Sequence, residues 1–414
     1  MDRTVTRSAL DEPVRPVRTG WIAAWSAGLF GWYMAYFAAA QILLPKQAEA
    51  IAGDDKVTLL AVVTGVAAVV TILVNIAVGA LSDRTLSRRG RRQVWVLGGA
   101  LLTGLAVSGQ GLQTTAVGMV LVWAIAQIGM SSTNAALMAA VPDEVPVSQR
   151  AWVSAFFGLA QAVGPLVGVA LVAVVVLDLA PGFALLGLLA LLLALPYSVG
   201  TRGVPLDPAE RPPLSIGAIA KGVVKPLRHH DFAWAWSGRF FIQLSNALAQ
   251  VYLFYYLQDY VKYPDPESGT LVLIVVYTIG VVIAAPLCGR LSDRTGRRKR
   301  LVVVSSVLQG AAGLLLAFLP TFGTSIVAAG ILGLGYGAYA AVDQALITQV
   351  LPRAEDRGKD LGVINVANNL PYVLTPVIGA AVLGSLGGYP TLMVLVLVTA
   401  VIAALTVQPI RSVR

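Results

Sequence analysis

The sequence predicts an all-α membrane protein with twelve transmembrane helices in two similar halves. Three observations lead to this prediction. Of the 414 residues, 57% are hydrophobic and only 12% are charged, with a mean hydropathy of +0.76. Apolar stretches long enough to cross a bilayer, about 20 residues each, recur along the whole chain. A basic motif near residue 80 returns 210 residues later.

The apolar stretches define the predicted spans. Lipid requires each segment to satisfy its own backbone hydrogen bonds, and long uninterrupted runs indicate helices rather than barrel strands. The twelve spans are expected at residues 20–44, 57–81, 94–112, 116–141, 151–177, 180–200, 232–258, 270–289, 301–320, 323–351, 361–385 and 389–408. The first stretch is long for a signal peptide, so we expect it to be retained as a helix.

The polar segments divide the chain into two halves. Residues 1–19 form an N-terminal tail, residues 201–231 a linker and residues 409–414 a C-terminal tail. Residues 20–200 and 232–408 are therefore expected to form one six-span half each.

Positive charge is concentrated on one side of these spans. The two tails and the loops on their side carry 26 of the 30 lysines and arginines, whereas the opposite loops carry only Lys46, Lys56 and Lys262. Because cytoplasmic loops are rich in Lys and Arg, both termini are expected on the cytoplasmic side of the inner membrane. Topology thus explains the net charge of +9, and no nucleic-acid partner is expected.

The chain repeats itself at about half its length. The stretch GALSDRTLSRRGRR, residues 79–92, is followed 210 residues later by GRLSDRTGRRKR, residues 289–300. At the same offset, Val141-Pro142 and Leu351-Pro352 end spans four and ten. Such a duplication is typical of transporters in which one half rocks against the other around a central site.

The pattern G-x-L-S-D-R-x-G-R-R resembles the signature loop of the major facilitator superfamily. This resemblance covers the whole chain: twelve spans, a long middle loop and two signature loops. It implies a major facilitator fold of two pseudo-symmetric six-helix bundles, alternating access, and a cavity lined mainly by spans one, four, seven and ten. The first loop is longer and in this respect resembles the sucrose–proton symporter and glycoside–pentoside–hexuronide branches.

The two basic loops are candidates for a cytoplasmic latch that is closed in one state and open in the other. Glycine lets helices approach closely, and an Asp at a helix end can cap free N–H groups or pair with Arg. The resemblance supports this role for Asp83 and Asp293 with their neighbours. The predicted latch residues are Gly79, Asp83, Arg84, Gly90, Arg91, Arg92, Gly289, Asp293, Arg294, Gly296, Arg297 and Arg298. The alternative is that these arginines only anchor the topology.

Two charged residues fall inside predicted spans, Arg239 in span seven and Asp343 in span ten. Each lies roughly 10–12 Å from the cytoplasmic end of its span at 1.5 Å per residue. Arg does not deprotonate in proteins and needs an anion. We therefore predict an Arg239–Asp343 ion pair. Two interpretations are open: a static bridge that locks the second half, or a carboxylate that exchanges a proton during transport.

Polar and aromatic stripes at helical spacing predict a substrate cavity on the four helices that the resemblance names. The alternative for any one of these side chains is a structural hydrogen bond between helices. The predicted cavity residues are Trp25, Trp32 and Tyr36 in span one, Gln127, Ser131 and Asn134 in span four, Gln243, Asn246 and Gln250 in span seven, and Tyr336 and Tyr339 in span ten. Asn365, Asn368 and Asn369 in span eleven are added to them.

An enzyme is not expected, because the chain has no nucleophile elbow, zinc-protease or Walker motif. No cofactor and no metal are expected. The predicted function is secondary transport of a small organic solute by a monomer in contact with membrane lipids, coupled to protons and favouring sugars or glycosides. The alternative is a drug or metabolite–proton antiporter, since Ala160-x-x-x-Gly164-Pro165-x-x-Gly168 partly matches a motif of such exporters. A facilitated uniporter and a non-transporting sensor or scaffold are further alternatives.

Overall fold

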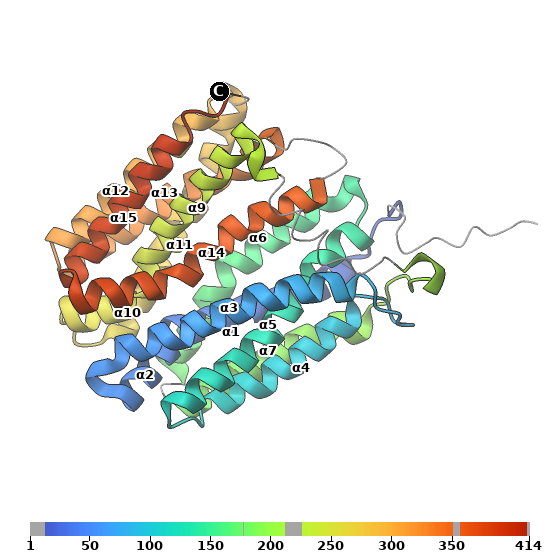
Figure 1. Ribbon diagram of the computed structural model, residues 1–414, viewed down its shortest axis with the longest axis horizontal. Helices are drawn as coiled ribbons and strands as arrows, with labels where there is room; N and C mark the ends of the chain where they lie inside the picture. Colours follow the sequence, from blue (N-terminus) through green and yellow to red (C-terminus); the bar gives the residue numbers. More distant parts are fainter. Residues whose placement is uncertain (1–12, 177, 212–225, 351–356, 412–414) are drawn as a thin grey trace, which may run out of the picture. The chain divides into compact units, whose positions relative to one another are not determined.

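The computed structural model describes residues 13–176, 178–211, 226–350 and 357–411, and its long elements are all helices (Figure 1). The chain divides into two compact units, Met1–Leu214 and Ser215–Arg414. The N-terminal unit contains α1 (Thr19–Ala38), α3 (Lys56–Ser82), α4 (Gln93–Gln110), α5 (Ala116–Glu144), α6 (Val147–Ala170) and α7 (Leu179–Gly200). The C-terminal unit contains α9 (His230–Val251), α11 (Pro266–Thr295), α12 (Arg298–Phe318), α13 (Phe322–Val350), α14 (Arg357–Ser385) and α15 (Gly388–Thr406).

These helices follow the predicted spans closely, which confirms the fold class. The two units also pack their helices in the same way. In the N-terminal unit the large contacts are α4 with α5, α4 with α7, α1 with α6, α1 with α7, and α3 with α5. In the C-terminal unit they are α12 with α13, α12 with α15, α9 with α14, α9 with α15, and α11 with α13. Each contact in one unit has its equivalent in the other, as expected for an internal duplication.

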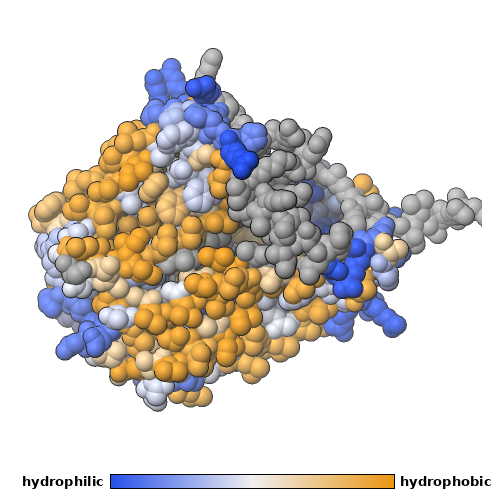
Figure 2. All heavy atoms as spheres, in the orientation of Figure 1, coloured by the Kyte–Doolittle hydropathy of each residue, from blue (hydrophilic) through white to orange (hydrophobic). Residues whose placement is uncertain are grey.

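The apolar surface of the described residues is that of a membrane protein. Side chains such as Leu105 and Phe318 are 73% and 68% exposed, and apolar side chains cover much of the face in Figure 2. A water-soluble monomer rarely exposes apolar surface on this scale. By length and composition, nine stretches of the described chain can cross a membrane, and the first of them, Thr19–Ser82, contains both α1 and α3. Helices α4 and α9 fall outside these nine; α9 carries the predicted polar stripe, which lowers its hydropathy.

A π-helical turn follows the first long helix of each unit. In the N-terminal unit this turn is Ala39–Leu43, between α1 and α2 (Leu44–Ala52). In the C-terminal unit it is Tyr256–Tyr260, directly after the short helix α10 (Leu253–Tyr255) that follows α9. In the second case the hydroxyl groups of Tyr256 and Tyr260 donate hydrogen bonds to the carbonyls of Leu316 and Ala317, at 2.8 and 3.2 Å. Those carbonyls lie in the last turn of α12 and have no partner within the helix. The two tyrosines therefore cap α12.

Glycines set the distance between the most closely packed helices. A Cβ atom added at Gly333 on α13 would lie 2.1 Å from the carbonyl oxygen of Tyr277 on α11. No side chain fits at that distance, so the α11–α13 contact requires glycine at this position. Glycines of the predicted exporter motif act similarly, since a Cβ at Gly168 would lie 2.3 Å from the carbonyl oxygen of Met34 on α1. Packing of α6 against α1 thus accounts for this glycine of the motif.

Candidate functional site

The predicted intramembrane ion pair is present in the C-terminal unit. Nη2 of Arg239 on α9 lies 3.1 Å from Oδ2 of Asp343 on α13, and the two residues are 7% and 8% exposed. The hydroxyl of Tyr339, one turn before Asp343, donates a 2.6 Å hydrogen bond to Oδ1. Both carboxylate oxygens are therefore engaged, while Nε of Arg239 has no partner in the described part of the chain.

The polar stripe of α9 continues from this pair across to α14. The amide of Gln243 donates to Oδ1 of Asn368. One turn further, the amide nitrogen of Asn246 donates to the hydroxyl of Tyr372 at 3.4 Å. Three predicted cavity residues thus lie in two hydrogen-bonded pairs, one turn of α9 apart, which together form a polar cluster between α9 and α14. Gln250 is partly buried at the end of the same stripe.

Two tyrosines of this cluster were not predicted. Tyr277 on α11 donates a 3.2 Å hydrogen bond to Oδ1 of Asn246, and its ring lies 6.2 Å from that of Tyr336. Tyr372 on α14 contacts Asn246 from the other side. A lone tyrosine in an apolar helix has no periodic pattern, so the sequence offered no signal for either. The side chains of Asn365 and Asn369 lie outside the described residues.

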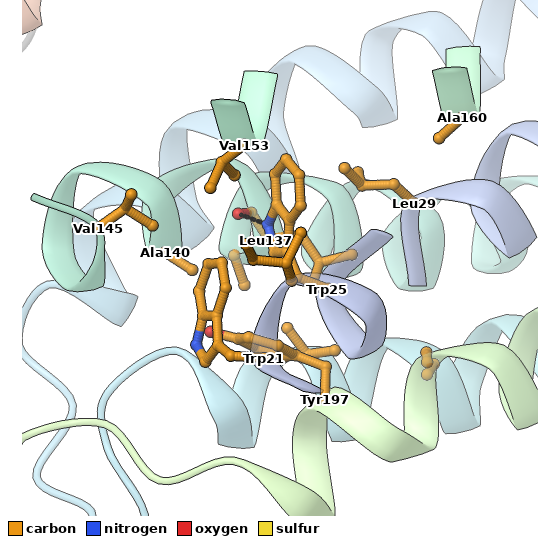
Figure 3. Close-up of a cluster of buried hydrophobic side chains, with 14 of the residues drawn as sticks. Trp21, Trp25, Leu29, Leu137, Ala140, Val145, Val153, Ala160 and Tyr197 are labelled. Atoms are coloured by element: carbon orange, nitrogen blue, oxygen red, sulfur yellow. Dashed lines mark hydrogen bonds between the residues drawn. The ribbon is translucent and has the colours of Figure 1, made fainter. Parts of the chain in front are cut away.

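In the N-terminal unit, the predicted aromatic residues mostly pack against their own unit. Trp25 is 1% exposed and donates a 2.7 Å hydrogen bond to the carbonyl of Leu137, within the core shown in Figure 3. Trp32 donates a 2.9 Å bond to the carbonyl of Met130 and stacks on Tyr36, with ring centroids 5.2 Å apart. Trp25 is therefore a core residue, whereas Trp32 and Tyr36 form a partly buried aromatic pair.

The polar residues of α5 are less engaged than those of α9. Gln127 is buried and accepts a hydrogen bond of 3.3 Å from Thr71 on α3, a residue that was not predicted. Ser131 is buried on the same face. Oδ1 of Asn134 is buried without a hydrogen-bond partner among the described residues. Such an orphaned acceptor costs free energy unless a ligand or water satisfies it.

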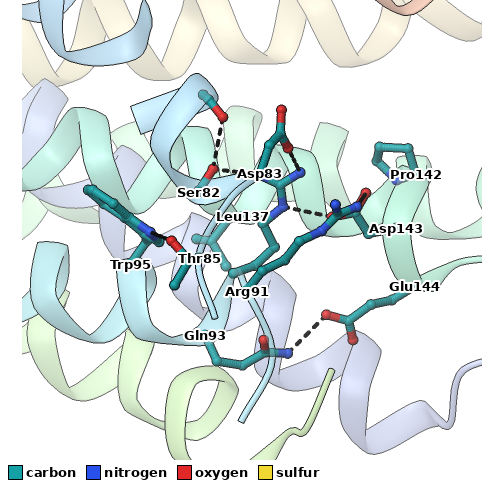
Figure 4. A network of polar contacts seen from close by, with 12 residues as sticks. Ser82, Asp83, Thr85, Arg91, Gln93, Trp95, Leu137, Pro142, Asp143 and Glu144 are labelled. Atoms are coloured by element: carbon teal, nitrogen blue, oxygen red, sulfur yellow. Dashed lines mark hydrogen bonds and ion pairs between the residues drawn. The ribbon is translucent and has the colours of Figure 1, made fainter. Parts of the chain in front are cut away.

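The first basic loop forms the network of ion pairs drawn in Figure 4. Arg92 is 5% exposed and bridges two helices: it lies 2.5 Å from Asp83 at the end of α3 and 2.7 Å from Asp143 near the end of α5. Arg91 also contacts Asp143, at 2.7 Å. Burial lowers the pKa of Arg92, but the charges of Asp143 and Asp83 more than offset it, so the pKa lies above its ordinary value. The guanidinium therefore stays charged.

The network shows which of the predicted latch residues contact each other. Asp83 pairs with Arg92 across the loop, whereas the side chain of Arg84 has no partner among the described residues. Gly90 has a φ of +108°, and a Cβ there would lie 2.4 Å from Oε1 of Gln93. At Gly79, in contrast, a Cβ would meet no atom within 4 Å. The backbone requires glycine at position 90, but close helix packing does not account for Gly79.

The second basic loop is shorter and differs in structure. Helix α11 continues through Arg294 to Thr295 and ends at Gly296, which has a φ of +65° as its left-handed cap. Helix α12 begins at Arg298, directly after Arg297. The side chain of Asp293 lies outside the described residues, and a Cβ at Gly289 would have only Ala341 nearby, at 3.9 Å. The extra residues of the first copy thus build a loop between α3 and α4 that the second copy lacks.

A carboxylate that the span map placed outside the helices lies at the end of α5. This helix continues past Pro142 to Glu144, three residues beyond the predicted end. Glu144 accepts hydrogen bonds from Trp21 at 2.6 Å, Gln93 at 2.9 Å and Tyr197 at 3.0 Å. The three donors come from α1, α4 and α7 and are all uncharged. Glu144 therefore ties four helices of the unit together without a cation.

Comparison with known proteins identifies the family. The sequence model of the Major Facilitator Superfamily matches residues 20–271 and 235–412. The chain belongs to this superfamily. It is accordingly a multi-pass membrane protein of the major facilitator type.

Two relatives from Bacillus subtilis (strain 168) match part of the chain. A stretch of 129 residues is 34% identical to the uncharacterized MFS-type transporter YfiU, covering 31% of this chain and 24% of that protein. Another of 114 residues is 31% identical to a bacillibactin exporter, covering 26% of this chain and 28% of that protein. The matches therefore span about a quarter of each relative's length.

Solved structures share the fold over nearly the whole chain. The peptide transporter POT superposes with a TM-score of 0.75 at 13% identity, over 98% of both chains. The nucleoside transporter NupG gives a TM-score of 0.72 at 11% identity, over 94% of this chain and 99% of that one. At such low identity the likeness establishes the fold alone.

Proposed function

We propose that this transporter is coupled to protons through Asp343 and carries a small, hydrogen-bonding organic solute by alternating access. The supporting observation is the buried pair of Arg239 and Asp343, which lies on the same stripe of α9 as Gln243 and Asn246, the residues that bond Asn368 and Tyr372. A charged side chain within a membrane helix costs several kcal/mol and by default marks a functional site. Because Arg239 lies on the same helix as Gln243 and Asn246, a change in the ion pair can alter the position of the solute-binding side chains, and solute binding can alter the ion pair.

The geometry of the pair suits a protonation step. Tyr339 donates to one oxygen of Asp343 and Arg239 holds the other. A proton on Asp343 would remove the charge that attracts Arg239 and so weaken the link between α9 and α13. The orphaned Nε of Arg239 gives the guanidinium a free donor for an anionic or hydroxyl group of a solute.

The chemistry of the cluster favours a solute rich in hydroxyl groups, such as a sugar or glycoside. Amides both donate and accept hydrogen bonds, and tyrosine rings offer flat apolar surfaces for stacking. Asn246, Tyr277, Tyr336 and Tyr372 supply both features within the C-terminal unit.

Export is the second candidate. It is favoured by the partial match to a bacillibactin exporter. A solute–proton antiporter would use the same Asp343 with the opposite direction of proton movement.

Transport in proteoliposomes tests the proposal, after a thermal-shift screen of sugars, glycosides and amphiphilic drugs has found a stabilising solute. For one proton per solute, a gradient of one pH unit supports about tenfold accumulation. We expect Asp343→Asn to reduce this ratio to about one but to leave counterflow exchange, which needs no net proton movement. Accumulation driven by outside acid indicates symport, and accumulation driven by inside acid indicates antiport.

Two further variants separate coupling from a static bridge. The double variant R239Q/D343N removes both charges; a static pair can be replaced in this way with little loss, whereas a coupling carboxylate cannot. The matched control is Asp259→Asn, an acid of the same unit whose Oδ2 accepts a hydrogen bond from Tyr389. Normal accumulation by R239Q/D343N would exclude Asp343 from coupling.

A further inference from the structure

A cleft of about 680 Å³ lies on the N-terminal unit where residues 15–18 meet the ends of α5 and α7. Its lining includes Arg15, Arg18 and Trp21 from the segment that leads into α1, Glu144 from the end of α5, and Arg202, which follows α7. The volume falls in the range of small-molecule sites, about 300–1,000 Å³. All of its lining residues belong to one unit.

Three arginines of this cleft have no partner within the described residues. The side chains of Arg15, Arg18 and Arg202 are exposed, and none of them contacts an acidic group or accepting oxygen in the part of the chain that the structure describes. Arg91 and Arg92 nearby are both paired with Asp143. Three unpaired guanidinium groups around one cleft repel each other and create a positive potential that an anion would relieve.

The acidic groups of the cleft do not neutralise these arginines. Asp143 is held by two arginines of its own. Glu144 is held by three uncharged donors, one of which is Trp21. The charge of the lining is therefore positive on balance.

The segment that carries Arg15 and Arg18 is held in place. The amide of Gln149 bonds both backbone groups of Val17, accepting from its N–H at 2.8 Å and donating to its carbonyl at 3.1 Å. Trp21, one turn further on, is fixed by its hydrogen bond to Glu144. The arginines are thus presented from an ordered backbone, which lowers the entropy cost of binding.

We propose that this cleft binds the phosphate group of an anionic phospholipid of the cytoplasmic leaflet. Arginine forms paired hydrogen bonds with phosphate oxygens, and basic pockets at the cytoplasmic ends of membrane helices suit such headgroups. Exposed apolar side chains lie near the arginines in sequence: Val14, directly before Arg15, is 78% exposed, and Val199, three residues before Arg202, is 56% exposed. This combination fits a lipid, with its phosphate in the cleft and its chains on apolar surface, better than a free phosphate.

Binding of short-chain phosphatidylglycerol to the full-length protein in detergent, followed by native mass spectrometry, tests the proposal. We expect the triple variant R15Q/R18Q/R202Q to bind it at least tenfold more weakly, since each arginine near a surface contributes measurably to lipid attraction. The matched control is R228Q/R300Q/R411Q, which removes three exposed arginines from the C-terminal unit and should bind like the unaltered protein. Equal losses in both variants would overturn the proposal.

Three comparisons define the ligand. Phosphatidylcholine should bind more weakly than phosphatidylglycerol, because its headgroup has no net charge. Inorganic phosphate should not compete at equal concentration; if it does, the site serves free phosphate and the lipid assignment is wrong. Added salt should weaken phosphatidylglycerol binding, because it screens the exposed arginines, and binding that does not change with salt would contradict an anion site.

Discussion

Asp143 is a single carboxylate that pairs with two buried arginines of the first basic loop. It contacts both Arg91 and Arg92, which are 8% and 5% exposed. Without it Arg91 would lose its carboxylate partner, and Arg92 would keep only Asp83. Removing one partner of a buried pair costs far more than the pair itself contributes.

We therefore predict that Asp143→Asn lowers the free energy of unfolding by about 3–5 kcal/mol, measured by SDS titration in detergent. Arg84→Gln is the matched control, because Arg84 lies in the same loop and its side chain has no partner in the described part of the chain. It should change the free energy by less than about 0.5 kcal/mol. Similar losses for both variants would show that the loop, not the Asp143 network, determines the effect.

Gly90 is the second residue on which this loop depends. Its φ of +108° is strained for any other residue, and a Cβ would also lie 2.8 Å from Cα of Gly203. Gly90→Ala should therefore destabilise the protein by about 1–3 kcal/mol in the same titration. Gly98→Ala on α4, where a Cβ meets nothing within 4 Å, should be neutral or stabilising, and an equal loss there would refute the argument.

At the scale of helices, close packing depends on small residues that face a neighbouring backbone. Gly333 lets α13 lie against α11 at Tyr277, the tyrosine that bonds Asn246 of the polar cluster. The helix contact and the candidate binding site are therefore connected. A change at Gly333 should affect both.

Gly333→Ala should force α13 away from α11, lower the thermal unfolding temperature and weaken solute binding. Thermal unfolding with and without the solute measures both effects. Gly323→Ala lies on the same helix, and its Cβ would meet nothing within 4 Å, so it should leave both quantities unchanged. Unaltered solute stabilisation in Gly333→Ala would separate the helix contact from the site.

For the whole molecule, the distribution of Lys and Arg predicts that both basic loops face the cytoplasm. Cys288 is the only cysteine, so its replacement by serine gives a background for single-cysteine labelling. We expect Ser87→Cys, between α3 and α4, to be protected from an impermeant maleimide in intact cells. Ser268→Cys, at the start of α11, should be labelled. The reverse pattern would overturn the topology.

The sequence by itself determined the class, the number and the approximate bounds of the long helices, since these depend on the length of apolar runs and on local polar breaks. It also identified Arg239 and Asp343, because charges within apolar helices are conspicuous and one cation needs one anion. The resemblance of the basic loops correctly indicated the superfamily, but it did not establish the sugar-type branch.

Only the tertiary structure decided which side chains meet. It paired Asp83 with Arg92, brought Asp143 to both buried arginines, and placed Trp25 in the core. It also added Tyr277 and Tyr372 to the polar cluster. These contacts depend on the rotation of each helix about its axis and on its distance from its neighbours. Both are determined by packing between residues that lie far apart in the sequence. The local periodicity of a single helix contains no information about them.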